Sequence, residues 1–347
     1  MTKQLNVGLI GCGEIAAGTT KSIQGAPSLR VVQCMDIRRD IAENLAKVYD
    51  APATDGLDDV LSNGDVQAVI ISTPHYEHAP VAIAAAKAGK HVLVEKPIAR
   101  ILKEADAMID AADRAGVKLC VFQVTAAAFD AVKAGELIRG GAIGNVAAVK
   151  LHGMACKPES YWHGGYTGRV KDDWRMSLKT SGGGFLIMNQ IHQLGTMVAA
   201  LDLRPERIYA EYGTFATPVE VEDFISFVMR LKGGAIFSLD GSSAAIGGGS
   251  FGDHIYGTKG HIVLGNPMKV HLSEPWGDLK AGEVNELSAP EEYADPRARM
   301  AEGFARAVLD GGQVPFDGRQ GRRALEIVRG AYLSMKRGRP VSFPVKE

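Results

Sequence analysis

The sequence predicts an α/β protein in which a doubly wound parallel sheet is followed by an α+β domain with an open, mostly antiparallel sheet. Its 347 residues exceed the size at which one hydrophobic core usually stops growing, so two domains are expected. The first third alternates short apolar runs with helical segments, as in βαβ units. Beyond about residue 122, strand-like runs follow one another directly. The expected domains are therefore residues 1–122 and 123–347.

The N-terminal part contains five apolar runs that predict buried parallel strands. These strands are expected at 5–10, 30–35, 67–72, 91–95 and 117–122. Helical periodicity between them predicts helices at 15–23, 39–49, 79–88 and 102–115. Because crossover connections share one handedness, the carboxyl ends of these strands, and any ligand, are expected along one edge of the sheet.

The C-terminal part begins with a predicted helix at 127–139 that Gly140 and Gly141 end. Strands are expected at 146–154, 207–215, 223–231, 235–241, 253–264 and 269–272, with a hairpin turn at 231–235. Helices at 297–309 and 319–335 close the chain. An open antiparallel sheet usually needs covering, which favours a homodimer or homotetramer over a monomer.

Composition narrows the class of protein. The formal net charge is -1, with 46% hydrophobic and 23% charged residues and no long basic run, so neither nucleic acid nor a membrane is an expected partner. No apolar stretch approaches the roughly 20 residues that span a bilayer, and no secretory leader is apparent. The four cysteines form no CxxC pair, which suits reduced thiols in a cytoplasmic protein.

The strongest local motif is Gly11-Cys12-Gly13-Glu14-Ile15-Ala16, a GxGxxA that follows a strand and opens a helix. Gly11 permits a tight turn, Gly13 leaves room for a pyrophosphate against the backbone, and Ala16 lets the helix approach the sheet. Unpaired N–H groups at the start of the helix attract phosphate. This context predicts a Rossmann-type dinucleotide-binding domain, and a glycine turn without a ligand is the alternative.

Asp36 lies 20 residues beyond Ala16, at the end of the second predicted strand. A carboxylate there accepts hydrogen bonds from ribose hydroxyls and repels a 2′-phosphate, which favours NAD. Arg38 and Arg39 follow closely and keep NADP as an alternative. The residues predicted to contact the cofactor from these two turns are Gly11, Gly13, Glu14, Ile15, Asp36, Ile37 and Arg38.

Two further strand ends carry polar residues on the same edge. In the segment 72–78, His75 and His78 are spaced i, i+3, but no third ligand has a recognisable spacing, so no metal is expected. Lys96 ends the next strand, where it can orient a substrate hydroxyl and, if desolvated, transfer a proton. Its alternative is an exposed charge at a strand end. The residues predicted to line the cofactor here are Thr73, Pro74, His75, His78, Glu95 and Lys96.

The segment 161–175 is rich in aromatic and hydrogen-bonding side chains and has no helical or strand periodicity. Aromatic faces beside carboxylates suit a polyhydroxylated ring, so a carbohydrate-like substrate is expected. The alternative is an interdomain or subunit-contact loop, because aromatic residues are also enriched at interfaces. The candidate substrate contacts in this segment are Tyr166, Asp173, Trp174 and Arg175.

The GxGxxA with Asp36, the Ser-Thr-Pro-x-x-x-His segment and the block Ala88–Pro97 (AGKHVLVEKP) together resemble the Gfo/Idh/MocA family, which includes glucose–fructose oxidoreductase and inositol dehydrogenase. The resemblance covers the N-terminal domain and continues more loosely through a glycine run, 182–184. It implies that Lys96 is the catalytic lysine of the EKP motif and that His192 is the general base. It also implies a C-terminal sheet whose face often forms the oligomer interface.

The chain departs from the family pattern around His192. Met188 occupies the position of the usual aspartate four residues before the histidine, and Gly195 that of a second aspartate. Asn189 can supply a neutral hydrogen bond instead. The segment 123–129 also lacks the arginine with an aromatic neighbour found in many relatives.

These observations predict an NAD(P)-dependent oxidoreductase. It would transfer hydride between the nicotinamide and a secondary alcohol or ketone of a sugar, sugar acid or cyclic polyol. The substrate contacts expected are Lys96, Tyr166, Asp173, Trp174, Arg175, Asn189 and His192. One alternative is a redox-neutral, NAD-retaining enzyme that cleaves glycosides or acts as a lyase. Another is a non-enzymatic dinucleotide or sugar sensor.

Overall fold

Two hydrogen-bonded sheets organise the computed structural model, which describes residues 3–168 and 170–346. The first sheet is parallel, with strand order β3-β2-β1-β4-β5-β6. Its strands are β1 (Leu5–Ile10), β2 (Leu29–Met35), β3 (Ala53–Thr54), β4 (Ala68–Ile71), β5 (His91–Glu95) and β6 (Leu119–Phe122). The chain direction across the sheet reverses between β1 and β4, which makes this the topological switch point. The predicted doubly wound sheet is confirmed.

The helices around this sheet follow the predicted alternation with three differences, of which one is an additional helix at 57–62. They are α1 (Glu14–Gly18), α2 (Thr20–Gln24), α3 (Arg39–Tyr49), α4 (Leu57–Ser62), α5 (His75–Lys87) and α6 (Leu102–Ala115). The single helix predicted at 15–23 is divided. The hydroxyls of Thr19 and Thr20 both donate to the Ala16 carbonyl, at 3.1 and 3.3 Å, and so compete with the helical hydrogen bonds. Helix α5 begins four residues earlier than predicted and contains Pro80.

The second sheet has the order β15-β14-β13-β12-β7-β10-β9-β8-β16, with β11 paired to β7. Its strands are β7 (Val146–Cys156), β8 (Pro205–Gly213), β9 (Phe224–Leu231), β10 (Ile236–Ser242), β11 (Ala244–Gly249), β12 (His254–Gly257), β13 (Gly260–Val263), β14 (Met268–Leu272), β15 (Val284–Leu287) and β16 (Val341–Ser342). Only the β7–β10 pair is parallel among the described strands of this sheet, so the mostly antiparallel prediction is confirmed. The predicted hairpin turn is present, with the Leu231 N–H bonded to the Ala235 carbonyl at 2.9 Å.

The strand predicted at 253–264 is two strands, β12 and β13. Between them, Thr258 and Lys259 donate their N–H groups to the carbonyls of Asn145 and Ile143, at 2.9 and 2.8 Å. These bonds turn the chain, so an apolar run that looks continuous in sequence forms a hairpin.

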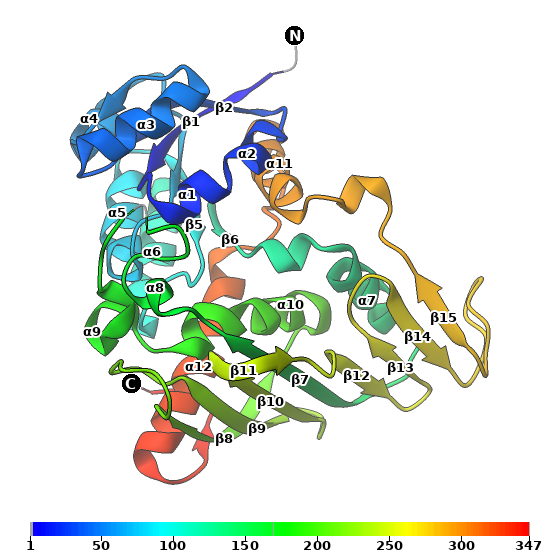
Figure 1. Ribbon diagram of the computed structural model, residues 1–347. Coiled ribbons are helices and arrows are strands. Elements are labelled where there is room, and N and C mark those ends of the chain that lie inside the picture. The colour runs from blue at the N-terminus through cyan, green and yellow to red at the C-terminus, as the bar shows by residue number, and fades with distance from the viewer. Residues whose placement is uncertain (1–2, 169, 347) are drawn as a thin grey trace. The chain divides into compact units, whose positions relative to one another are not determined.

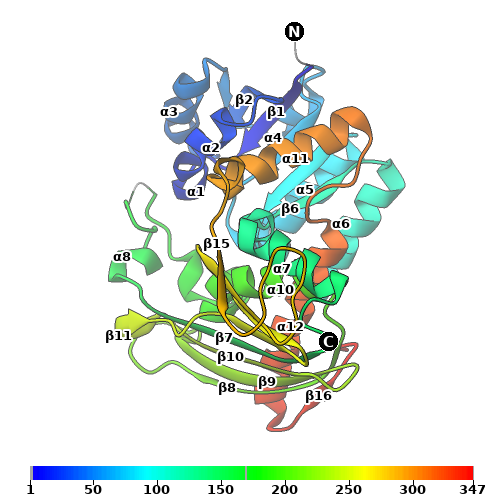
Figure 2. The same cartoon turned by 90° about the vertical axis from the view of Figure 1, so that its right-hand side faces the viewer.

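The remaining helical segments connect or cover the strands. They are η1 (Val124–Ala127), α7 (Phe129–Gly140), α8 (Glu159–Trp162), η2 (Trp174–Met176), α9 (Leu178–Ser181), the π-helical turn η3 (Leu186–Gln190), α10 (Ile191–Leu201), η4 (Glu291–Tyr293), α11 (Pro296–Asp310) and α12 (Gly318–Arg337). Helix α10 lies over one face of the second sheet (Figure 2). In the described part of the chain, no helix is long and apolar enough to cross a membrane.

The chain forms two compact units that alternate along the sequence. The first comprises the residues up to Val124 together with Pro158–Gly182 and Asp295–Leu325. The second comprises Thr125–Lys157, Gly183–Ala294 and the residues from Glu326 onward. The expected single boundary after residue 122 would assign Pro158–Gly182 and Asp295–Leu325 to the second domain, whereas they belong to the first compact unit. The division of binding roles between a dinucleotide domain and a substrate domain stays a prediction.

Helix α11 completes the core of the first unit. It packs against α2, β1, β2 and β6, and Figure 1 shows α11 in orange beside the blue α2. Phe304 of this helix and Phe316 beyond it are fully buried. The Glu302 carboxylate accepts hydrogen bonds from the hydroxyl and N–H of Ser28, at 2.7 and 2.9 Å. The Val121 N–H of β6 donates to the Phe316 carbonyl at 2.9 Å. These contacts bind a late segment of the chain to the first sheet.

Phe304→Ala is expected to destabilise the first unit by about 3–5 kcal/mol, because it removes a fully buried aromatic ring and leaves a cavity. Urea-induced unfolding measures the loss. Arg306→Ala on the exposed side of the same helix is the control, with an expected cost below about 1 kcal/mol. Equal effects of the two substitutions would show that α11 is not part of this core.

Candidate dinucleotide site

A cavity of about 410 Å³ lies at the carboxyl ends of β1, β2 and β4, within the first unit. This is the switch-point edge where ligands bind in open α/β sheets. The sequence-predicted residues that line it are Gly11, Gly13, Glu14, Ile15, Asp36, Ile37, Arg38, Thr73, Pro74, Trp174 and Arg175. The structure thus brings most of the predicted cofactor contacts together at one cavity wall.

The two glycines of the first turn serve different purposes. Gly11 has a φ of +83°, and a β-carbon there would lie 2.8 Å from the Ser72 carbonyl carbon and the Thr73 nitrogen. Its lack of a side chain is therefore required by the neighbouring turn after β4. A β-carbon on Gly13 would meet only Val170 Cγ2, at 3.6 Å, and would project into the cavity. Gly13 therefore keeps the backbone open to a ligand.

The Asp36 carboxylate is held in place by two backbone N–H groups. One oxygen accepts from Cys12 at 2.8 Å and the other from Arg38 at 3.0 Å. The nearby guanidinium groups already have acidic partners: Arg38 pairs with Asp40 at 3.1 Å, and Arg39 with Glu43 at 3.1 Å. A fixed carboxylate beside neutralised arginines favours ribose hydroxyls over a 2′-phosphate.

Thr73 provides a test of whether these residues fit NAD. Its hydroxyl oxygen is buried and has no hydrogen-bond partner among the described residues, although Thr73 lines the cavity. Buried hydroxyls normally have a partner, so this one is available to a bound ligand. With the open backbone at Gly13 and the fixed carboxylate of Asp36, the cavity offers groups for the phosphate, ribose and further polar parts of a dinucleotide.

His75 and His78 do not line the cavity. Nδ1 of His75 lies 2.8 Å from the Ser181 carbonyl, and burial lowers the pKa of His75. The ring of His78 bridges the turns after β4 and β5: Nδ1 lies 2.8 Å from the Pro97 carbonyl and Nε2 3.0 Å from that of Thr73. Burial lowers the pKa of His78 to about 4, so its ring is neutral near pH 7. Both histidines hold backbone segments that surround the site.

Glu95 is the last residue of β5, the neighbour of β4 in the sheet, and Lys96 follows it directly. The Lys96 N–H donates to a Glu95 carboxylate oxygen at 3.2 Å, and burial raises the pKa of Glu95. Both side chains are half-buried. This places Lys96 on the carboxyl edge of the sheet, as predicted, although neither residue lines the cavity.

The segment Pro158–Gly182 forms part of the cavity wall, to which it contributes four residues besides the predicted Trp174 and Arg175. Gly164, Val170, Lys171 and Asp172 line the cavity from this segment. The Glu14 carboxylate accepts a hydrogen bond from the N–H of Thr167, at 2.8 Å, and another from its hydroxyl. The adjacent glycines 164 and 165 permit this close approach, since both have positive φ and a β-carbon on Gly165 would lie 2.9 Å from Glu14 Cγ.

The four candidate substrate contacts in the segment 161–175 lie in different environments. The Arg175 guanidinium is buried against two rings, 4.5 Å from the Trp174 ring centre and 5.1 Å from that of Tyr161. Trp174 also contacts the His75 ring at 4.5 Å. Asp173 instead lies beside His163, at 2.9 Å, with an exposed side chain. Tyr166 is 56% exposed. Only Trp174 and Arg175 of this set reach the cavity.

His192 lies in the second unit, in the first turn of α10. Its carbonyl accepts hydrogen bonds from the hydroxyls of Thr125 and Thr196, at 2.9 and 3.1 Å. Asn189 and His192 are both half-buried, whereas Met188 is 2% exposed. An aspartate at position 188 would therefore have to bury its carboxylate here, which explains why an apolar residue suits the position.

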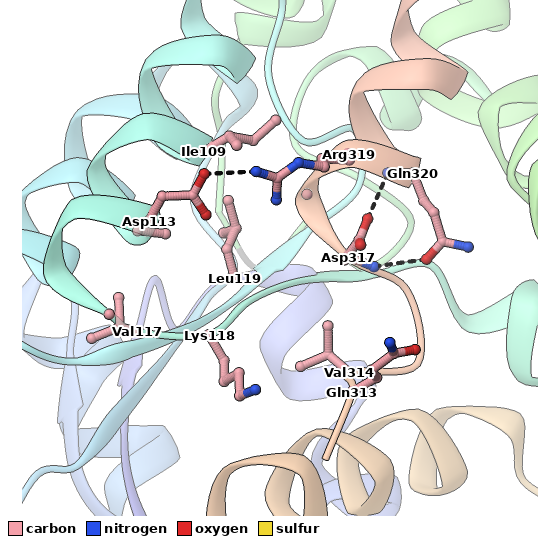
Figure 3. Close-up of a pocket in the computed structure, with 13 residues that line it drawn as sticks. Ile109, Asp113, Val117, Lys118, Leu119, Gln313, Val314, Asp317, Arg319 and Gln320 are labelled. Atoms are coloured by element: carbon pink, nitrogen blue, oxygen red, sulfur yellow. Dashed lines mark hydrogen bonds and ion pairs between the residues drawn. The ribbon is translucent and has the colours of Figure 1, made fainter. Parts of the chain in front are cut away.

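A second cavity, of about 400 Å³, lies where β6 begins, on the opposite edge of the first sheet (Figure 3). Four of its polar side chains already have partners, and among them Asp113 pairs with Arg319 at 2.7 Å. Asp317 and Gln320 exchange hydrogen bonds of 2.7 and 3.0 Å between side chain and backbone, as in a capping box. These contacts account for the residues structurally, and the switch-point cavity is the better candidate site.

The fold and the first cavity define a dinucleotide-binding oxidoreductase with a Rossmann domain. Residues 5–123 match the family model "Oxidoreductase family, NAD-binding Rossmann fold", and residues 131–263 match the "GFO/IDH/MocA C-terminal domain". The chain belongs to the Gfo/Idh/MocA family of oxidoreductases.

Curated relatives match over nearly the whole chain. Levoglucosan dehydrogenase of Pseudarthrobacter phenanthrenivorans is 28% identical, with 90% of this chain and 91% of the relative covered. Myo-inositol 2-dehydrogenase of Thermotoga maritima is 26% identical, with 98% of each covered. Among solved structures, levoglucosan dehydrogenase in complex with NADH and levoglucosan has a TM-score of 0.87 and 22% identity, covering 99% of this chain and 100% of that one. The structural likeness supports the same two-sheet fold.

Asp36→Ala is expected to weaken NAD binding roughly 10- to 100-fold, because hydrogen bonds to a charged group contribute about 1.5–3 kcal/mol. NADP binding should weaken less, since removal of the carboxylate also removes its repulsion of a 2′-phosphate. Fluorescence titration with NADH and NADPH measures both. The control is Asp40→Ala, in which the guanidinium of Arg38 loses its acidic partner. There we expect NADPH to bind more tightly than to wild type and NADH binding to stay unchanged. An unchanged NADH-to-NADPH ratio in Asp36→Ala would contradict the assignment.

Proposed function

We propose that the protein is an NAD-dependent dehydrogenase or reductase that acts on a CH–OH group of a sugar, sugar acid or cyclic polyol. The observation that carries this proposal is the switch-point cavity, where a fixed Asp36 carboxylate and an available Thr73 hydroxyl meet an open glycine turn. The sugar and polyol dehydrogenases among its relatives support the substrate class.

Bound NAD supplies the nicotinamide that accepts or returns a hydride. The protein must then move a proton between the substrate hydroxyl and a basic group, because oxidation of a secondary alcohol removes both. We assign this task to Lys96 and His192. A lysine ammonium can orient and polarise the hydroxyl, and a histidine titrates near neutral pH, where it can take the proton.

The remaining assignments divide between cofactor and substrate. Asp36 selects NAD through the ribose, with NADP as the weaker alternative, and Thr73 offers its hydroxyl to the cofactor. Trp174 and Arg175 support binding from the segment that closes one wall of the cavity. Asn189 is half-buried in the helical segment that leads to His192 and contacts the substrate in this proposal.

Lys96→Ala is expected to lower kcat by roughly 10²–10⁴-fold, the usual contribution of a group that transfers or orients a proton. NADH binding should change little, because Lys96 does not line the cavity. The assay follows absorbance at 340 nm with a panel of sugars and polyols. Lys87→Ala, an exposed lysine on α5, is the control. Normal turnover in Lys96→Ala would remove this lysine from the mechanism.

We also propose a cytoplasmic homodimer or homotetramer. The open face of the second sheet carries apolar side chains that project to solvent from neighbouring strands, among them Phe224, Val228, Ile236 and Tyr256, each 38–47% exposed. Large apolar side chains gathered on one exposed face commonly mark a protein–protein interface. A second copy of the chain would cover it. Three of the four cysteines are buried and all four are free thiols, which supports a reducing compartment.

Val228→Arg is expected to shift the protein toward a monomer, because it places a charge in the centre of this apolar face. Light scattering coupled to size-exclusion chromatography measures the mass. Lys103→Glu, an exposed change on α6, should leave the mass unchanged. A wild-type protein that is monomeric at micromolar concentration would refute the proposed assembly.

A further inference from the structure

Glu222 is a buried carboxylate outside the cofactor cavity. It lies just before β9, is 4% exposed, and belongs to the second unit. Its side chain accepts three hydrogen bonds, from the N–H of Gly184 at 2.6 Å, the N–H of Leu186 at 2.9 Å and the hydroxyl of Tyr332 at 2.8 Å. Its backbone carbonyl accepts a fourth from the Phe185 N–H at 3.0 Å. One residue thus satisfies three successive N–H groups.

These three N–H groups begin the helical segment that carries His192. The first N–H groups of a helix have no partner within the helix and carry its positive partial charge, so a carboxylate there is favourable. Glu222 supplies this carboxylate from 38 residues away in the chain. It therefore sets where the segment begins.

Glu222 and Tyr332 also explain the glycine run. A β-carbon on Gly184 would lie 1.9 Å from the Glu222 carbonyl oxygen and 2.7 Å from its carboxylate. A β-carbon on Gly183, where φ is +151°, would lie 2.2 Å from the Tyr332 hydroxyl. Gly183 and Gly184 are required because the Tyr332 side chain and the backbone and carboxylate of Glu222 occupy the space where β-carbons would stand.

The same segment is fixed to the sheet at its centre. Gln190 donates from Nε2 to the Gly153 carbonyl at 3.1 Å, and its side chain fills a notch formed by Gly153 and Gly241, which pair across β7 and β10. Three residues later, Gln193 donates to both oxygens of Asp253, at 2.7 and 2.9 Å. His192 lies between these two contacts. The π-helical turn before His192 contains an additional residue per turn compared with an α-helix. The direction in which the His192 side chain points therefore depends on where the helical segment begins.

We propose that Glu222 is a positioning residue for His192, acting through the start of the helical segment and supported by Tyr332. The proposal rests on the proposed function, in which His192 handles the substrate proton. A displaced segment would misdirect the imidazole without removing it. The expected consequence is slower turnover with an unchanged cofactor site, because the cavity lies in the first unit.

The charge state of Glu222 matters near neutral pH. Burial raises the pKa of Glu222 to about 7. The titratable groups that interact with it are Tyr332 of α12 and Tyr212 of β8, and the charge of Arg329 on α12 acts on both tyrosines. As the pH falls below about 7, the carboxylate is protonated and one oxygen no longer accepts as strongly, so the hold on the segment weakens. This protonation predicts slower turnover on the acid side, because the start of the segment that carries His192 is then held less firmly.

The test is Glu222→Gln, which keeps the size of the side chain. The amide replaces one acceptor oxygen with an NH₂ donor, so at least one of the two backbone N–H groups loses its acceptor. We expect kcat to fall about tenfold or more, with the Kd for NADH within about twofold of wild type. Below pH 7, the decrease of kcat with falling pH should also be less steep in Glu222→Gln than in wild type.

A double-mutant cycle with His192→Ala separates positioning from general damage. If Glu222 acts through His192, Glu222→Gln lowers kcat no further in the His192→Ala background. If the same fall appears in both backgrounds, the proposal is wrong. Wild-type turnover in His192→Ala alone would instead refute the proposed function, which distinguishes the two failures.

Tyr332→Phe provides a second, milder variant in case Glu222→Gln does not fold. It removes one hydrogen bond and leaves the carboxylate in place. We expect kcat to fall about threefold, again with no further fall in the His192→Ala background. An unchanged kcat in folded Tyr332→Phe, or an equal fall in both backgrounds, would overturn the proposal. Ser334→Ala, on α12 and bonded to Ala210 rather than to Glu222, is the matched control.

Discussion

The close approach of two backbone turns is the constraint on which the candidate site depends. Gly11 lies so near Ser72 and Thr73 that a β-carbon would overlap their backbone atoms. This approach joins the carboxyl ends of β1 and β4 into one wall, because no side chain separates them. From the same turn, the Cys12 N–H fixes the Asp36 carboxylate at the end of β2. Three strand ends thus become one surface able to hold a long ligand.

The sequence predicted those elements whose pattern is set locally. β1, α3 and α6 have the predicted bounds, because alternation, apolar spacing and the C-terminal Gly116 of α6 all act within a few residues. The predictions failed where side chains compete with the backbone or where distant carbonyls turn the chain. Thr19 and Thr20 interrupt the first helix through the Ala16 carbonyl, and the β12–β13 turn depends on carbonyls more than 100 residues earlier.

The candidate site shows the same division. Gly11, Asp36 and Thr73 were predictable, since parallel strands place their carboxyl ends on one edge and each residue follows a recognisable strand. From the segment Pro158–Gly182, Trp174 and Arg175 were predicted, but the part near Gly164 and Val170 was not, because a hydrogen bond between Thr167 and the distant Glu14 attaches it to the cavity. The glycine run before His192 was visible in sequence, but its physical cause lies in side chains that only the folded chain brings to it.

The discontinuity of the first unit has a consequence for how the protein is made. Its sheet is complete in sequence by Phe122, yet part of its core, including Phe304 and Phe316, is encoded close to the end of the chain. During synthesis, the apolar surface of the first sheet that α11 covers stays exposed while almost all of the second unit is translated. Contacts between such distant residues slow folding and prolong exposure to aggregation. We therefore expect the first unit to complete its core only after α11 has emerged from the ribosome.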